Sequence, residues 1–121
     1  MRSVLRSKIH KATVTQADLG YVGSISIDLD LLERTGLWAG ERVLVTSNSS
    51  GARLETYVIP APALSGTIGM NGAAAHLIKE GEEIIIMGFE LTDCPISPRM
   101  ILVDKQNRFL RDLVEKSGDR L

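Results

Sequence analysis

Gly23 and Ser24 place a hydroxyl directly after a glycine, at the entry to a short alternating apolar and polar stretch over 24–27. Glycine has no side chain to shield its carbonyl carbon, so the Ser24 hydroxyl can approach that carbon and take over the acyl group from nitrogen. The amide then becomes an ester, and elimination to dehydroalanine followed by hydrolysis leaves a keto group, a pyruvoyl, at residue 24. By itself, however, a Gly-Ser pair before a strand is an ordinary turn.

Length and composition narrow the classes of protein to consider. The chain has 121 residues, 44% of them hydrophobic, and a mean hydropathy of +0.07, which predicts one globular domain spanning 1–121. Fourteen basic and fifteen acidic residues give a net charge of -1, which argues against nucleic acid and anionic membranes as partners. One cysteine and two histidines argue against a disulfide and a metal site. No apolar run reaches about 20 residues, so we expect no membrane span and a cytoplasmic location.

Hydrophobic alternation predicts a chain built mainly of short strands. Asp28 is expected to cap a short helix that ends near Gly36, and a second helical turn is expected over 73–77. The strands are predicted at 4–13, 24–27, 41–47, 53–59, 67–70, 83–89 and 100–103, with 83–89 buried on both faces. This pattern favours a mainly β fold, a small closed or nearly closed β-barrel with short helices, over a β-sandwich.

Three further segments are assigned from local patterns alone. The stretch 15–18 is similar to a capping box and predicts one helical turn. Phe109, Leu110, Leu113 and Val114 have helical spacing, which predicts a helix over 107–116. The tail over 117–121 is expected to be frayed.

Four pieces of sequence together resemble the pyruvoyl-dependent aspartate 1-decarboxylase family. The stretch 8–15, followed by Ala17-Asp18-Leu19, Tyr21 and Gly23-Ser24, is similar to the N-terminal signature of that family. Arg53 with Thr56-Tyr57, and Asn71-Gly72-Ala73-Ala74-Ala75-His76, are similar to its later motifs. The likeness covers 1–89, whereas the chain from Leu91 onward matches only weakly.

The resemblance implies a fold, a maturation step and a reaction. The fold is a double-psi β-barrel, assembled as a homotetramer with active sites between subunits. The implied zymogen cleaves itself between Gly23 and Ser24, into a β-chain of residues 1–23 and an α-chain of residues 24–121. The covalently bound pyruvoyl group derived from Ser24 would form a Schiff base with L-aspartate and draw off the electrons left by departing CO2. The product, β-alanine, would supply pantothenate and coenzyme A biosynthesis.

The family motifs also imply roles for individual residues. Lys8 and Arg53 would bind the substrate carboxylates, and the guanidinium of Arg53 can hold a carboxylate with two hydrogen bonds. Arg53 is expected on the retained carboxylate, because a strong ion pair to the departing one would stabilise the ground state. Tyr57 would return a proton to the carbon left by decarboxylation. Thr56 would donate to the Gly23 carbonyl oxygen during self-cleavage.

The remaining implied site residues surround the cleavage point. Asn71 would take part in self-cleavage and donate to the pyruvoyl carbonyl. Gly72, Ala73 and Ala74 would bind substrate, since small side chains there let the backbone approach closely. Tyr21 would line the pocket, and no metal ligand is implied. Each of these residues also has an ordinary structural explanation in a turn, a strand or a solvated surface.

Two other functions stay open at this point. A catalytically silent barrel that serves as a binding or assembly module could retain the same motifs as fold determinants. A pyruvoyl lyase acting on another amino acid is the second alternative. A maturation helper protein is also compatible with the sequence.

Overall fold

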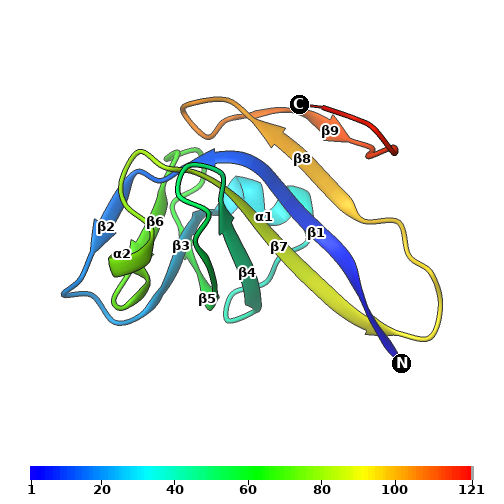
Figure 1. The fold of residues 1–121 in the computed structure, drawn as a ribbon, viewed down its shortest axis with the longest axis horizontal. Coiled ribbons are helices and arrows are strands. Elements are labelled where there is room, and N and C mark those ends of the chain that lie inside the picture. Colours follow the sequence, from blue (N-terminus) through cyan, green and yellow to red (C-terminus); the bar gives the residue numbers. More distant parts are fainter. Residues whose placement is uncertain (121) are drawn as a thin grey trace.

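The computed structural model describes residues 1–120 and contains nine strands and two short helices in that range (Figure 1). In chain order they are β1 (Arg2–Thr13), β2 (Gln16–Asp18), β3 (Ser24–Asp28), α1 (Leu29–Thr35), β4 (Arg42–Ser47), β5 (Arg53–Ala61), β6 (Ile68–Asn71), α2 (Ala74–Leu77), β7 (Glu83–Thr92), β8 (Arg99–Val103) and β9 (Phe109–Leu113). The predicted mainly β class with short helices is therefore confirmed.

The strands form one mixed sheet in the order β2-β6-β3-β5-β4-β7-β1-β8-β9. The pairs β1–β8, β2–β6 and β3–β5 are parallel, and the other neighbours are antiparallel. In Figure 1, β2, β6 and α2 lie at one end of the molecule, and β8 and β9 lie beyond β1 at the other. The hydrogen-bonded ladder does not close, but the arrangement is compatible with the expected double-psi β-barrel.

Alternating burial along the strands builds the core. On β3, Ile25 and Ile27 are fully buried, as their period of two predicts. β7 differs from the prediction, because Ile84 and Ile86 are buried whereas Ile85 and Met87, which alternate with them, are only half-buried. One face of β7 therefore packs on the core, and the other lies toward the surface. The fully buried large side chains are Ile9, Val14, Ile25, Ile27, Leu31, Leu32, Ile68, Met70, Ile78, Ile84, Ile86 and Ile101.

Helix α1 begins and ends where the sequence indicates. The buried Asp28 carboxylate accepts a hydrogen bond from the Asp30 backbone N–H at 2.9 Å, which caps the first turn. The same carboxylate accepts from the backbone N–H groups of Leu64 and Gly66, each at 2.9 Å, and so ties the loop before β6 to the helix. Gly36 closes the helix in the left-handed conformation.

Two of the locally assigned segments were predicted wrongly. The segment expected to be helical over 107–116 forms strand β9, which pairs with β8. Leu113 is buried, but Leu110 and Val114 are 55% and 76% exposed, so no helical apolar face exists there. The segment expected to form a helical turn over 15–18 contains strand β2, paired in parallel with β6. The Thr15 side chain exchanges hydrogen bonds with the Ile68 backbone, which starts this pairing.

The C-terminal tail, expected to be frayed, makes defined contacts as far as it is described. The Lys116 backbone N–H donates to the Asp119 carboxylate at 2.8 Å, and the Asp119 N–H donates to the Lys116 carbonyl at 3.0 Å. These two bonds form a turn beside β1. Leu121 lies outside the described residues.

Candidate active site

Three strands bring the predicted cleavage residues together. Ser24 begins β3 and lies opposite Asn71, the last residue of β6, in an antiparallel pair. β5 runs along the other side of β3 and contributes Thr56. These residues line a pocket of about 290 Å³, and its full lining is Gly23, Ser24, Leu54, Glu55, Thr56, Asn71, Ala73, Ala74 and Leu77. The sheet therefore places residues far apart in sequence around one hydroxyl.

Ser24 is held in an unusual conformation inside this pocket. Its φ is +148°, a value that residues with side chains rarely adopt. Such conformations destabilise the chain by about 1–3 kcal/mol and persist only where surrounding structure enforces them. The residue is 1% exposed and cannot relax into solvent. Local strain thus lies on the residue that follows the Gly23–Ser24 peptide bond.

The Asn71 side chain is aimed at this residue. Its Nδ2 donates to Ser24 Oγ at 2.9 Å and also to Ser26 Oγ at 3.0 Å. Its Oδ1 is buried and has no hydrogen-bond partner among the described residues. An unpaired buried acceptor is rare, and it leaves hydrogen-bonding capacity free beside Ser24. The free Oδ1 can accept a hydrogen bond from a donor beside residue 24, whereas Nδ2, which already donates to Ser24 Oγ, can donate equally to a carbonyl oxygen at that position.

Gly72 allows the chain near the cleavage point to pack closely on itself. Its φ is +63°, and a Cβ placed there would lie 2.9 Å from Gly23 Cα and 3.0 Å from both Gly23 N and Tyr21 O. Only glycine fits between these backbone atoms. At Gly23, by contrast, an added Cβ would meet nothing within 4 Å. The steric requirement for glycine thus lies at Gly72, whereas Gly23 has open space around it.

The other predicted substrate residues do not reach this pocket within one chain. Successive side chains of a strand point to opposite faces, so Arg53 and Tyr57 lie on the face of β5 away from Thr56. Both are exposed, Tyr57 by 42%. Tyr21 is 50% exposed and is not among the residues that line the pocket. The predicted site is therefore divided between two regions of the chain.

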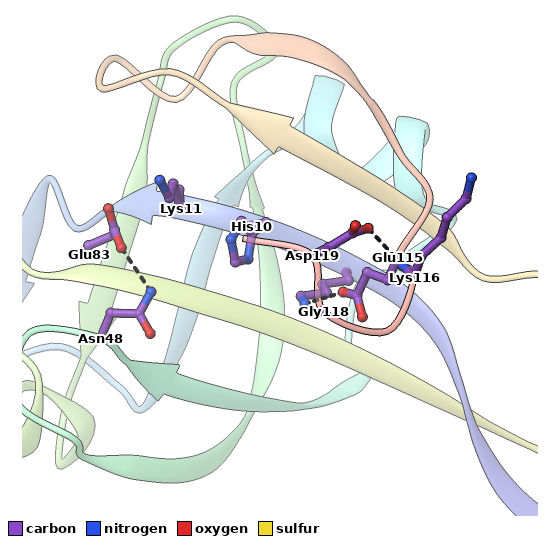
Figure 2. A pocket seen from close by; sticks show the side chains of 9 residues that line it. His10, Lys11, Asn48, Glu83, Glu115, Lys116, Gly118 and Asp119 are labelled. Carbon is purple, nitrogen blue, oxygen red and sulfur yellow. Dashed lines mark hydrogen bonds and ion pairs between the residues drawn. The ribbon is translucent and has the colours of Figure 1, made fainter. Parts of the chain in front are cut away.

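Lys8 lies in a separate pocket of about 450 Å³ on the outside of the sheet (Figure 2). Its Nζ forms an ion pair with the Glu115 carboxylate, which the C-terminal segment delivers across β1. In Figure 2, Glu115 and Asp119 lie on the loop that passes in front of His10. The lining is Lys8, His10, Lys11, Asn48, Glu83, Glu115, Lys116, Gly118 and Asp119. Sequence reasoning missed Glu115 because nothing local relates it to a residue 107 positions earlier.

The charges around this second pocket act on His10. Burial lowers the pKa of the His10 imidazole from its ordinary value of 6.5, and the positive charges of Lys8 and Lys11 lower it further. Glu83 and Glu115 act in the opposite direction. Since Nδ1 is buried without a partner among the described residues, the folded chain favours the neutral ring.

The described residues offer no metal centre. Within residues 1–120 there is no group of three or more His, Cys, Asp or Glu side chains placed to hold an ion. No helix in that part of the chain is long and apolar enough to cross a membrane.

Comparison with known proteins identifies the family of this chain. Residues 1–110 match the family described as "Aspartate decarboxylase", which extends the predicted likeness beyond Phe89. The aspartate 1-decarboxylase of Corynebacterium efficiens is 52% identical over 114 residues, covering 91% of this chain and 84% of the relative. Aspartate 1-decarboxylase 1 of Frankia casuarinae is also 52% identical, over 91% of this chain and 74% of the relative. The chain belongs to the aspartate decarboxylase family.

Proposed function

We propose that this chain cleaves itself between Gly23 and Ser24 and then decarboxylates L-aspartate to β-alanine and CO2. The observation that carries the proposal is the strained, buried Ser24, whose hydroxyl accepts a hydrogen bond from Asn71. Family membership supports the same reaction. β-Alanine made in this way would feed a biosynthetic step that condenses an amine with a carboxylic acid, as in pantothenate formation.

The cleavage begins with attack of Ser24 Oγ on the Gly23 carbonyl carbon. The C–N bond of the amide breaks, the nitrogen takes a proton, and Gly23 becomes esterified to Ser24 Oγ. Loss of the Ser24 Cα proton then breaks the Cβ–Oγ bond, and Oγ leaves as part of the new Gly23 carboxylate. Water replaces the nitrogen of the resulting dehydroalanine, which releases ammonia and leaves a pyruvoyl group at residue 24.

Neighbouring residues assist this step. Thr56 lines the same pocket, and its hydroxyl would donate to the Gly23 carbonyl oxygen as that oxygen becomes negative. The Asn71 Nδ2 group would stabilise the attacking Ser24 oxygen. Relief of the Ser24 backbone strain favours bond breakage at this position.

In the mature chain, the pyruvoyl group would supply an electron sink for decarboxylation. Asn71 would hold it through its amide N–H, and Ala73 and Ala74 would leave room for substrate beside it. Arg53 would bind the retained substrate carboxylate and Lys8 the other one, while Tyr57 would hold the proton delivered to the product carbon.

The division of these residues between two regions supports a homotetramer with sites between copies. Across the paired strands, Lys8 lies opposite Met87, Met87 lies opposite Leu44, and Leu44 lies opposite Glu55. Residues opposite one another point to the same face of a sheet, so Lys8 and the outer face of β5 share one surface. That surface carries half-buried Leu44 and Met87. We infer that it packs on another copy and presents Lys8, Arg53 and Tyr57 to the neighbouring Ser24 pocket.

Product analysis tests the proposed reaction. The purified chain should release CO2 from L-aspartate and form β-alanine, with much slower release from L-glutamate and none from neutral amino acids. Ser24→Ala should abolish release. Preference for another amino acid would identify a different pyruvoyl lyase, and no release by fully cleaved protein would favour a silent binding module.

A further inference from the structure

We propose that Ser26 is a positioning residue that fixes the rotation of the Asn71 amide, both before and after cleavage. The inference deepens the proposed function and rests on it for its catalytic consequence. It starts from the two hydrogen bonds that Asn71 Nδ2 donates, one to Ser24 Oγ at 2.9 Å and one to Ser26 Oγ at 3.0 Å.

Strand geometry explains why both hydroxyls reach one amide. Ser24 and Ser26 are two residues apart on β3 and therefore point to the same face. Asn71 lies opposite Ser24 on β6, so its side chain lies next to both serines. A primary amide has two N–H bonds, and this pair of acceptors uses both. The plane of the amide is thereby fixed by two bonds.

Cleavage removes one of these two acceptors. In the proposed reaction, Ser24 Oγ departs with the Gly23 carboxylate, so Asn71 Nδ2 loses that contact. Ser26 Oγ is unchanged by the chemistry and stays as the second acceptor. Because Asn71 Oδ1 has no partner among the described residues, it gives no competing anchor. Ser26 therefore keeps the other N–H directed at residue 24 when the carbonyl of the keto group replaces the hydroxyl.

The test compares Ser26→Ala with Ser26→Thr, which keeps a hydroxyl. Ser3→Ala removes a serine from the exposed start of β1 and serves as the matched control. Self-cleavage is followed by intact mass, and kcat and KM for L-aspartate are measured on the fully cleaved fraction. We expect Ser26→Ala to cleave about tenfold more slowly and to lose about tenfold in kcat, with KM within about twofold, as for loss of one aligned hydrogen bond. Ser26→Thr should remain within about threefold of the wild type on both measures.

A spectroscopic measurement separates this inference from the proposed function. In the uncleavable Ser24→Ala chain, Ser26 is the remaining acceptor, so adding Ser26→Ala should shift the Asn71 side-chain amide resonances upfield and speed their exchange. Adding Ser3→Ala should leave them unchanged. Unshifted Asn71 resonances, or wild-type cleavage and kcat in Ser26→Ala, would overturn the positioning role. If the wild type neither cleaves nor decarboxylates but the resonances shift, the contact stands and the proposed function fails.

Discussion

Gly72→Ala should damage the site more than any other single methyl group added near the cleavage point. The new Cβ would lie 2.9 Å from Gly23 Cα and 3.0 Å from Gly23 N. These neighbours are backbone atoms, which cannot rotate away as the end of a long side chain can. The segment that contains the Gly23–Ser24 bond must therefore move away from β6.

The size of the effect follows from two contributions. Alanine at φ +63° is disfavoured by about 1–2 kcal/mol relative to glycine. Overpacking a closely fitted position typically destabilises by about 1–3 kcal/mol. Together these give a loss of about 2–5 kcal/mol in the free energy of unfolding. This is a large part of the total free energy of unfolding of a typical domain, which is roughly 5–15 kcal/mol. Gly23→Ala has open space around its methyl group and should change stability by less than about 1 kcal/mol.

Urea unfolding in a Ser24→Ala background measures the loss without interference from cleavage, and Gly23→Ala in the same background is the control. Self-cleavage of Gly72→Ala with Ser24 intact is then followed by mass. We expect at least a hundredfold slower cleavage, because displacement of Gly23 removes its carbonyl from reach of Ser24 Oγ. Equal stability of the two alanine variants, or cleavage of Gly72→Ala at the wild-type rate, would refute the reasoning.

Three other changes have defined outcomes. Glu115→Gln frees Lys8 from its ion pair and should lower KM for L-aspartate about two- to fivefold at low salt. Glu80→Gln, which removes an exposed carboxylate elsewhere, is the control and should leave KM unchanged. An unchanged KM in Glu115→Gln would show that Lys8 does not bind substrate. Because the pKa of His10 is lowered in the folded chain, its neutral ring favours folding above pH 6.5, and this contribution is lost as pH falls. His10→Asn should therefore make the free energy of unfolding, measured with urea, less dependent on pH between pH 7.5 and 5. A pH dependence as steep as that of the wild type would contradict this expectation. Asn107→Ala breaks three hydrogen bonds to Thr13 and Gly66 and should lower the free energy of unfolding by about 2–4 kcal/mol; a change under about 1 kcal/mol would contradict that role.

The strand faces on which the candidate site residues lie could be predicted because their signals are local. The alternation of polar and apolar residues over 24–27 placed Ser24 and Ser26 on one face, and the alternation of side chains along β5 separated Thr56 from Arg53 and Tyr57. The strain at Ser24 was not predictable in detail, since it depends on pairing with Asn71 across two strands. The Asn71–Ser26 contact is equally a property of strand register.

The errors arose where tertiary contacts decide between helix and strand. Phe109, Leu110 and Leu113 fit a helical spacing, yet an open edge of β8 is available to pair with them, and strand β9 forms. The short stretch at 16–18 forms a strand because it pairs with β6, although its sequence is similar to a helix-capping pattern. Glu115 forms an ion pair with Lys8 because the chain after β9 returns to β1, and no local sequence pattern indicates this contact.

The mass of the purified protein tests the central claim most directly. The account predicts two polypeptides, residues 1–23 and residues 24–121, with the larger one carrying a keto group in place of its first amine. Ser24→Ala should give one intact chain. A fully active protein whose mass is that of the uncleaved 121-residue chain would contradict the account.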